Sequence, residues 1–407
     1  ARTDPGLHPS IPLVCRLRNS LSVFFLILAL CVSCPGSVRA QDLSIPLQMG
    51  EPEAWLVTYS PGEVYWQRFG HNAIWIRDPT RGLDHVFNSG FFDFNQERFF
   101  QRFIQGRMLY FSAAQPAARE FEQYRHENRS ITAQKLDLGI LEYETLLNYL
   151  VEQVKVENRD YLYDYYLDNC STRIRDAIDA AVGGAIASAL SSSPAPQNFR
   201  AHTRRSVSGD FWYHLALETA LGLPVDRGIS RWNEMFLPAV VARELAEFQY
   251  EARALVSAEH VIFASQAVPV PAEPPRTWWR YLGIGLLIAA LFCLLGRLAG
   301  PVMSRGSVNA WLMVAASGGL ILAYLWFFTN HQAAGPNINL LLLNPLFLAG
   351  LWPGARKFTA VLLFAGLLAC GIQLLFPGGQ FNLDVWSFLL PVNAVAAWWF
   401  WTRGSET

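Results

Sequence analysis

The sequence is poor in charged residues. Only 16% of the 407 residues are charged, 52% are hydrophobic, and the formal net charge is −1. Without an excess of basic residues, the chain lacks the electrostatic footprint of a nucleic-acid-binding protein. It also contains no internal repeat and no Gly-rich phosphate loop, and we expect no cofactor. The composition therefore favours a membrane protein over a soluble one.

Cysteine is scarce in the part of the chain that we expect outside the cytoplasm. Of the six cysteines, three lie near the N-terminus and two lie in apolar segments: Cys15, Cys31, Cys34, Cys293 and Cys370. Cys170 is the one that remains, so it has no disulfide partner in that part. A single thiol in an oxidising compartment indicates a chemical role.

Residues 1–40 are predicted to be a secretory signal peptide. Arginines precede an apolar run over 21–32, and a small-x-small cleavage site ends at Ala40. Two alternatives remain open: the segment stays uncleaved as an anchor, or it is a lipobox that ends at Cys34. The sequence begins with Ala rather than Met, and we interpret residues 1–15 as non-native.

The rest of the chain divides into three parts. Residues 41–267 have a mixed composition and predict a folded domain with a sizeable core, and residues 268–276 form a Pro-rich linker. Residues 277–403 predict five membrane spans, each near the roughly 20 residues that a bilayer requires: 278–296, 308–328, 338–352, 358–376 and 386–402. All Lys and Arg of the connecting loops fall on one side, which places residues 41–267 outside the cytoplasm.

Alternating and helical patterns predict an α+β catalytic domain. Expected strands are 53–60, 71–77 and 84–90, the last two joined by a turn. Expected helices are 141–157, 171–190 and 231–257.

Cys170 and His71 are the candidate nucleophile and base. Cys170 opens the helical run CSTRIRDAI, and the positive end of a helix stabilises a thiolate. His71 opens a predicted strand, from which an imidazole can reach a packed helix N-terminus. The alternatives are a buried structural cysteine and an ordinary surface histidine. We expect His71 to deprotonate Cys170.

A third group should orient the imidazole. In a hairpin of 71–77 with 84–90, His71 lies opposite Asn88 or Ser89, and Asn88 is the expected partner. His85 is an alternative, although it lies nearer the turn. A metal site of His71, His85 and Cys170 lacks tight ligand spacing, so no metal is expected.

Four further residues are candidate substrate contacts. Asn169 and Ser171 flank Cys170, and amides at this helix start can hold a developing oxyanion. Tyr166, in a tyrosine-rich run, is a candidate for a polar head group, with aromatic packing as the alternative. Asn344 lies in the third apolar segment, where a polar residue often faces a cavity. Its alternative role is to satisfy the backbone that Pro345 frees.

Two aromatic clusters, GFFDF at 90–94 and FFQRF at 99–103, have no assigned role. The alternatives are that these clusters line an acyl groove, insert into the membrane interface or pack in the core. Core packing is the default interpretation.

Together, FGHNAIWI, VFNSGFFDF and YLYDYYLDNCSTRIRDAI resemble the permuted branch of the NlpC-type papain-like superfamily, which includes lecithin:retinol acyltransferase. The chain is more closely similar to the Lnb-type bacterial lipoprotein N-acyltransferases over about 50–265, and this similarity extends through NINLLLLNPL. The resemblance implies a circularly permuted papain-like domain with Cys170 and His71 as catalytic residues. It leaves the third member open.

The resemblance also implies a reaction and a location. An acyl chain moves from a phospholipid donor to the α-amino group of a diacylated lipoprotein through a Cys170 thioester. The enzyme lies in the bacterial inner membrane with its catalytic domain in the periplasm. Three alternatives remain: a cell-wall peptidase or amidase, a phospholipase or thioesterase of the same chemistry, and a non-enzymatic membrane sensor.

Overall fold

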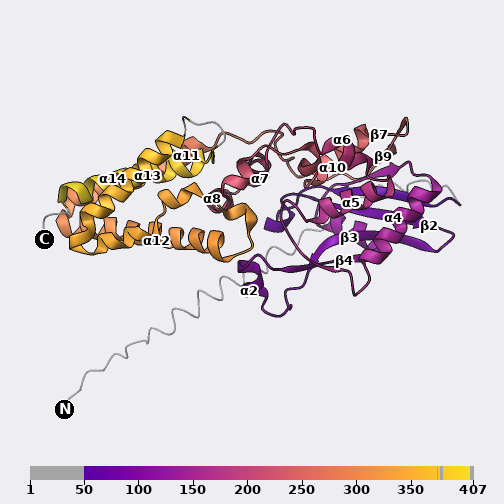
Figure 1. The fold of residues 1–407 in the computed structure, drawn as a ribbon, viewed down its shortest axis with the longest axis horizontal. Coiled ribbons are helices and arrows are strands. Elements are labelled where there is room, and N and C mark those ends of the chain that lie inside the picture. The colour runs from indigo at the N-terminus through magenta and orange to yellow at the C-terminus, as the bar shows by residue number, and fades with distance from the viewer. Residues whose placement is uncertain (1–49, 374, 376–378, 404–407) are drawn as a thin grey trace, which may run out of the picture. The chain divides into compact units, whose positions relative to one another are not determined.

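The computed structural model describes residues 50–373, 375 and 379–403. The predicted signal peptide over 1–40 lies outside these residues. Within them the chain forms an antiparallel sheet with packed helices, followed by a bundle of apolar helices (Figure 1).

The sheet has seven strands in the order β6-β4-β3-β2-β1-β5-β9, and every neighbouring pair is antiparallel. The strands are β1 Glu53–Tyr59, β2 His71–Asp78, β3 Leu83–Phe92, β4 Leu109–Pro116, β5 Ile131–Leu136, β6 Asp160–Leu162 and β9 Val256–Phe263; a separate hairpin pairs β7 Gln249–Tyr250 with β8 Arg253–Ala254. The three predicted strands are confirmed.

Side-chain alternation gives the two faces of the sheet different helices. On one face, Ile74 shares a core with Ile174 and Ile178 of α5. On the other face, the ring of Phe121 in α3 meets Trp75 edge-on, with ring centroids 5.1 Å apart. The helices of this part are α2 Phe99–Ile104, α3 Ala117–His126, α4 Ile140–Gln153, α5 Cys170–Ala181, α6 Ala185–Leu190, α7 Phe199–Val207, α8 Phe211–Ala220, α9 Arg231–Glu234 and α10 Pro238–Glu247, with 3-10 turns η1 Tyr65–Gln67 and η2 Leu223–Asp226.

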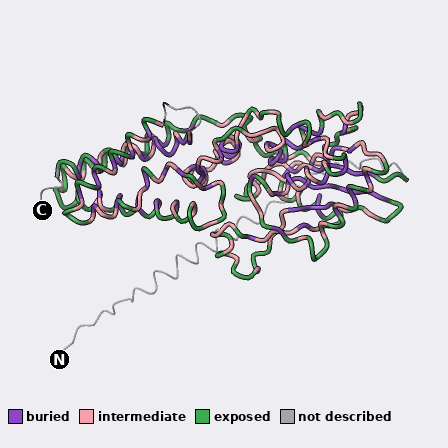
Figure 2. The backbone as a smooth tube through the Cα atoms, in the orientation of Figure 1, coloured by how far each residue is buried: buried purple, intermediate pink, exposed green. Residues whose placement is uncertain are grey.

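Figure 2 shows burial concentrated on the central strands and on the inner sides of the helices. The helix predicted over 231–257 is wrong in its extent. It is α9, then α10 starting at Pro238, then the β7–β8 hairpin, because Pro lacks the N–H that a continuous helix requires.

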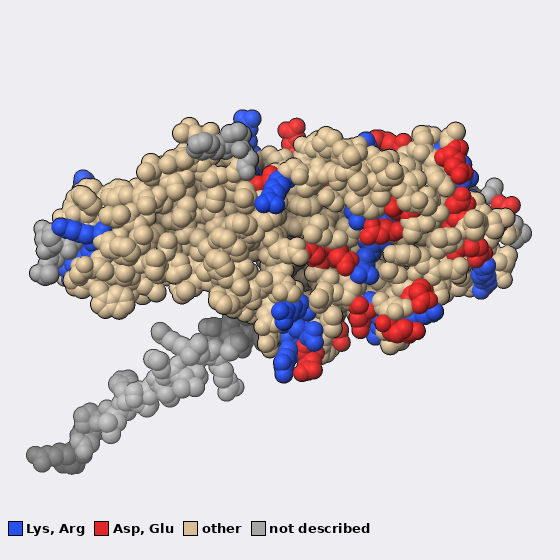
Figure 3. All heavy atoms as spheres, in the orientation of Figure 1, with Lys and Arg blue, Asp and Glu red and all other residues tan. Residues whose placement is uncertain are grey.

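Among the described residues of the C-terminal part, four helices are long and apolar enough to cross a membrane. They are α11 Trp278–Leu298, α12 Gly300–Phe328, α13 Arg356–Gln373 and α14 Leu383–Arg403. The visible face over these helices is almost free of charged side chains, whereas Lys, Arg, Asp and Glu are frequent over the sheet domain (Figure 3).

The third predicted span is not an α-helix, so the expectation of five spanning helices is not confirmed by the described residues. Residues 338–355 form 3-10 turns: η4 Ile338–Leu341, η5 Pro345–Leu351 and η6 Pro353–Ala355, preceded by η3 Gln332–Ala334. The physical cause is local capping. Asn337 accepts the N–H of Asn339, and Asn344 accepts that of Leu346, so the asparagines compete with helical hydrogen bonding.

This 3-10 segment still packs between α12 and α13. A Cβ on Gly319 of α12 would lie 2.1 Å from the Leu343 carbonyl oxygen, and one on Gly366 of α13 would lie 2.3 Å from that of Leu341. Asn393 of α14 donates to the Leu342 carbonyl at 2.9 Å. Irregular backbone within an apolar bundle is tolerated where protein groups satisfy it in this way.

Polar side chains tie α8 to the apolar bundle. Asn382, just before α14, donates to the Glu218 carbonyl at 2.6 Å, and Asn337 donates to that of Thr219 at 2.9 Å. His214 pairs with Asp384 at 3.1 Å. The sheet domain is therefore attached by buried hydrogen bonds as well as by the chain.

Candidate active site

Cys170 is the first residue of α5, and a capping box fixes this helix start. Asn169 Oδ1 accepts the N–H groups of Ser171 and Thr172 at 2.8 and 3.0 Å, while Thr172 Oγ1 accepts the N–H of Asn169 at 2.8 Å. Cys170 is partly exposed and has no disulfide. Its thiol thus lies at the positive end of the helix dipole.

His71 opens β2 and is held by Asn88 from β3. The His71 Nε2 to Asn88 Oδ1 distance is 2.8 Å. Because an amide oxygen only accepts, Nε2 carries the proton and Nδ1 remains for the thiol.

Gly90 brings the cysteine and the histidine together. A Cβ placed on Gly90, whose φ is +110°, would lie 3.4 Å from Cys170 Cβ and 4.0 Å from His71 Cε1. Because glycine has no side chain, Gly90 leaves open the space that Cys170 and His71 flank.

The electrostatics of Cys170 and His71 favour an ion pair. Burial disfavours the charged form of both side chains. For each of them, the interaction with the other side chain outweighs this effect. The pKa of Cys170 is lowered by the His71 imidazolium, by a hydrogen bond to it and by the Asn72 backbone N–H. The pKa of His71 is raised by the Cys170 thiolate, by hydrogen bonds to Cys170 and Asn88, and by Glu120. This arrangement favours the thiolate form of Cys170.

Glu120 is a member of this hydrogen-bonded cluster that the sequence did not reveal. Its side chain is fully buried in α3 and accepts Asn88 Nδ2 at 2.6 Å and Gln115 Nε2 at 2.9 Å, as well as the Tyr59 hydroxyl. Glu120 therefore sets the amide orientation that turns Asn88 Oδ1 towards His71.

Two tyrosine rings lie on one side of the His71 imidazole. Tyr124 stacks on Tyr59 with ring centroids 3.5 Å apart, and Tyr59 stacks beside His71 at 5.9 Å. These rings restrict the imidazole to an orientation in which it meets both Asn88 and Cys170.

The other predicted partners of His71 lie elsewhere. Ser89 is the next residue after Asn88, so its side chain points to the opposite face of the sheet, where it bonds Ser112 at 2.8 Å. His85 is paired with Ile76, five residues along β2 from His71 and thus about 17 Å away. The predicted register was also inexact: Asn88 pairs with Ala73 and reaches His71 diagonally.

Three of the four predicted substrate contacts carry structural bonds. Asn169 caps α5 and also donates to the Tyr165 and Phe236 carbonyls. The hydroxyl of Tyr166 is buried and bonds Thr203 at 2.8 Å. Asn344 caps η5, where its Oδ1 accepts the N–H of Leu346.

Ser171 is the predicted contact that stays beside the nucleophile. It is fully buried, and its Oγ lies 3.9 Å from Cys170 Sγ. The Ser171 and Thr172 amides are already occupied by Asn169, so the backbone N–H of Cys170 is the remaining candidate from this helix start for an oxyanion.

An aromatic wall leads away from Cys170. Gly90, on which a Cβ would lie 3.4 Å from Cys170 Cβ, is followed on β3 by Phe92. Burial raises the pKa of the neighbouring Tyr110 and Tyr163, and the Cys170 charge adds to this. Their ring centroids are 4.1 Å apart, and Tyr110 contacts Phe92 at 5.3 Å. Phe92 in turn contacts Phe94 at 4.9 Å. This set, Tyr163, Tyr110, Phe92 and Phe94, is called the aromatic wall below.

Within the described residues, no group of three or more His, Cys, Asp or Glu side chains is arranged to hold a metal ion.

Comparison with protein families decides the affiliation. The model of the Lnb N-terminal periplasmic domain matches residues 47–207, and that of the Lnb transmembrane domain matches residues 279–376. The chain belongs to the Lnb family. The two matches include the whole Cys170–His71–Asn88–Glu120 cluster and most of the apolar bundle. No curated protein and no solved structure matched the chain.

Membership of the Lnb family gives a coarse description of the protein. It has a periplasmic α+β domain and several transmembrane helices, so it is a multi-pass membrane protein. The Lnb domains imply a function like that of a lipoprotein N-acyltransferase.

Proposed function

We propose that this Lnb protein moves an acyl chain from a phospholipid to the α-amino group of a lipoprotein's diacylglyceryl-cysteine, through a thioester on Cys170. The observation that carries the proposal is the meeting of Cys170 and an Asn88-oriented His71 at Gly90, in a domain attached to a membrane bundle. A thioester reacts readily with amines, so a cysteine nucleophile suits this acceptor.

In the first half-reaction, the Cys170 thiolate attacks the ester carbonyl of the phospholipid. A sulfur–carbon bond forms, and the tetrahedral oxyanion is held by the Cys170 backbone amide. When the ester carbon–oxygen bond breaks, His71 Nδ1 donates its proton to the departing lysophospholipid oxygen. Asn88 keeps the neutral imidazole in the tautomer with the proton on Nε2.

In the second half-reaction, the lipoprotein amine attacks the thioester carbonyl. His71 Nδ1 takes the proton that the amine loses as the amide bond forms. The sulfur–carbon bond then breaks, and the leaving thiolate is again paired with the imidazolium. No redox or metal step is required by this sequence.

Attachment to the membrane contributes to rate. Both proposed substrates are anchored in the outer leaflet of the inner membrane, where we place this protein. Confinement of enzyme, donor and acceptor to one plane supplies proximity without tight binding. The aromatic wall offers an apolar surface for the acyl chain next to the thiolate.

Mass spectrometry of a model lipoprotein's N-terminal peptide tests the proposal. The lipoprotein is expressed in cells that lack their own N-acyltransferase, together with the wild type, Cys170→Ala or Cys293→Ala. Cys293 is an exposed cysteine of α11, so its variant controls for loss of a thiol elsewhere. We expect one amide-linked acyl chain with the wild type and Cys293→Ala, and none with Cys170→Ala.

The alternatives give other results. An acylated amine without a net gain in mass identifies the lipoprotein's own ester as donor and rejects the phospholipid. Acylation by Cys170→Ala removes Cys170 from its role. An unmodified amine with every variant, despite folded protein in the membrane, rejects the transferase in favour of a hydrolase or a sensor.

A further inference from the structure

The segment between β3 and β4 exposes an unusual amount of apolar surface. We call residues 93–108 the β3–β4 excursion; it contains the short helix α2. Phe94, Phe100, Phe103 and Ile104 are 61%, 77%, 48% and 49% exposed. Contiguous aromatic side chains of this exposure on a periplasmic domain mark an interaction surface.

The excursion is bonded to the outer end of a membrane helix. The N–H of Asn330 donates to the Gln105 carbonyl at 2.9 Å, and His331 Nε2 donates to that of Phe103 at 3.1 Å. Gly106, with a φ of +65°, allows the close approach, because a Cβ there would lie 3.0 Å from His331 N. α2 therefore lies at the level where α12 leaves the bilayer.

The same level carries further exposed aromatic side chains. The last two residues of α12, Phe327 and Phe328, are 62% and 73% exposed. Aromatic rings concentrate at this boundary because they combine an apolar body with tolerance of head groups. The apolar surface of α2 thus continues the lipid-facing surface of α12.

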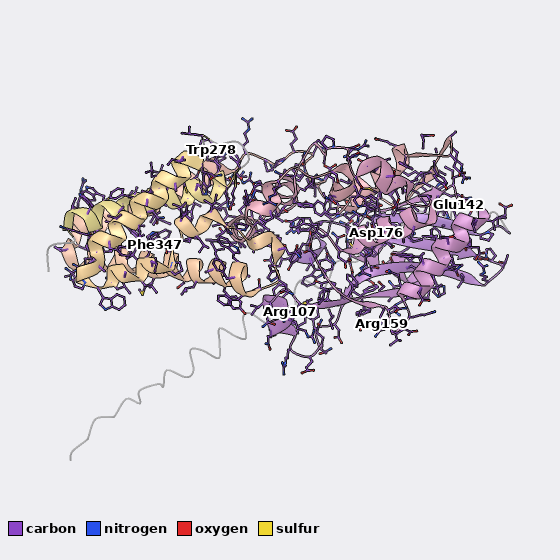
Figure 4. The ribbon with its side chains drawn as sticks, in the orientation of Figure 1. Arg107, Glu142, Arg159, Asp176, Trp278 and Phe347 are labelled. Atoms are coloured by element: carbon purple, nitrogen blue, oxygen red, sulfur yellow. The ribbon has the colours of Figure 1, made fainter. Side chains whose placement is uncertain are left out.

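The charges of the excursion fit an anionic head-group layer. Three arginines, Arg98, Arg102 and Arg107, flank the exposed rings. Of the two acidic residues, Glu97 pairs with Arg98 at 3.5 Å and Asp93 accepts the N–H of Asn95. Figure 3 shows basic side chains over this region, and Figure 4 places Arg107 beside α2. Arginines next to apolar residues are the composition of an interfacial membrane element.

We infer that the β3–β4 excursion is seated in the extracytoplasmic leaflet, with Phe100, Phe103 and Ile104 among the acyl chains and Arg98, Arg102 and Arg107 at the phosphates. This membrane contact of the excursion does not depend on the acyl-transfer chemistry. It also puts the aromatic wall, which joins α2 through a Phe94–Phe99 contact at 5.2 Å, at the lipid surface.

Spin-label depth measurements on the full chain test whether the β3–β4 excursion lies in the leaflet. A nitroxide is attached at Phe100→Cys, with the native cysteines replaced by alanine, and the protein is reconstituted in nanodiscs of zwitterionic and anionic phospholipid. The control is Leu141→Cys at the start of α4. Leu141 is 78% exposed against 77% for Phe100, and its neighbour Glu142 lies at the far end of the sheet in Figure 4.

At position 100, the nitroxide is expected to collide more often with oxygen, which dissolves in the bilayer, than with a water-soluble nickel complex. At position 141, the nickel complex is expected to collide more often than oxygen. Equal water accessibility at both positions overturns the proposal. Shielding of position 100 from both reagents overturns it too, because that pattern means a protein partner or a second copy.

A second measurement leaves α2 unaltered. The native chain is irradiated in nanodiscs whose phospholipid carries a photoreactive group near the head of the acyl chain. Adducts are expected on residues 99–107 and on α12, but not on α4. Adducts on α12 with none on 99–107 overturn the inference even if the labelled variant folds poorly.

Discussion

The Glu120 carboxylate holds the amide of Asn88, with 2.6 Å between Oε2 and Nδ2. Because a carboxylate accepts and only the Asn88 nitrogen donates, this bond decides which end of Asn88 faces His71. We therefore expect the buried carboxylate to be a positioning group, which acts on Cys170 through Asn88 and His71.

Glu120→Gln should shift the pH dependence of acyl transfer. The Glu120 charge contributes to the raised pKa of His71, so its removal lowers that pKa. His71 then loses its proton at a lower pH, and the alkaline limb of the rate profile moves to lower pH, with about a tenfold loss of maximal rate. The measurement is the rate of thioester formation against pH.

The matched control for this prediction is Glu122→Gln, on the same helix with a side chain 77% exposed. Its profile should equal that of the wild type. An unshifted alkaline limb in Glu120→Gln would show that the carboxylate matters only for packing.

Gly90→Ala should separate activity from stability. Ala at φ +110° is strained, and its methyl group enters the space between Cys170 and His71. Gly82→Ala is the control, since Gly82 also has a positive φ of +64° but meets nothing within 4 Å. Both variants should lose about 1–2 kcal/mol of unfolding free energy, measured by denaturation in detergent.

Only Gly90→Ala should lose transfer activity, by at least about tenfold. Equal activity of the two alanine variants would mean that the reacting groups do not approach each other over Gly90.

Alkylation reports on the ion pair without a lipid substrate. His71 lowers the pKa of Cys170 below the ordinary value for a thiol, so iodoacetamide should modify the wild-type thiol rapidly at neutral pH. His71→Ala raises that pKa, and its modification at pH 7 should slow by about tenfold or more and recover above about pH 9. The readout is the mass of the peptide that contains Cys170.

Asn88→Ala keeps the imidazole and should give an intermediate rate. If His71→Ala reacted as fast as the wild type at pH 7, the helix dipole and the Asn72 amide alone would stabilise the thiolate.

Glu218 anchors α8 by accepting bonds from Arg200 and Arg204 at 3.2 and 2.7 Å. Burial opposes its charge, but the two guanidinium groups lower its pKa. A depressed pKa stabilises the fold above the pKa of the unfolded state, and this contribution is lost as the pH falls through the folded value. Thermal stability should therefore decline on acidification below about pH 4.

Glu218→Ala removes the carboxylate partner of the buried Arg204, while Arg200 keeps its ion pair with Asp226, and should cost about 3–5 kcal/mol. It should also flatten that acid dependence. The exposed Glu247→Ala serves as control, and an equal loss in both variants would contradict the anchoring role.

The sequence predicted what depends on local pattern. The strands around His71 were recognisable because apolar and polar residues alternate, and the start of α5 because a helical run opens at Cys170. Proximity of Cys170, His71 and Asn88 followed from a hairpin and a helix N-terminus. Glu120 was not predictable, because in AAREFEQYRH it looks like any charged residue of an exposed helix.

The conformation of the third membrane segment was not predicted, for a different reason. Hydropathy reports the apolar composition of 338–352 but not its hydrogen bonding. Its conformation depends on caps by Asn337 and Asn344 and on Asn393, a residue of another helix that satisfies the Leu342 carbonyl. Such long-range partners are visible only in the folded chain.

Asn169→Ala distinguishes a helix cap from a substrate contact. Asn169 Oδ1 accepts two amides at the start of α5, and Nδ2 donates to two carbonyls, so its bonds are used within the fold. Asn198→Ala is the matched control, because Asn198 caps α7 through Ala201 and donates to the Asp226 carbonyl. Both variants should lose about 1–2 kcal/mol, measured by denaturation.

The two caps should differ in their effect on the thiol. Loss of the Asn169 cap frays the turn that carries Cys170, which weakens the dipole at the sulfur and slows alkylation of Cys170 at pH 7. Asn198→Ala leaves that turn intact and should react like the wild type. If Asn169→Ala kept full stability and thiol reactivity but raised KM for the lipid donor, the side chain would contact substrate and the capping role would be rejected.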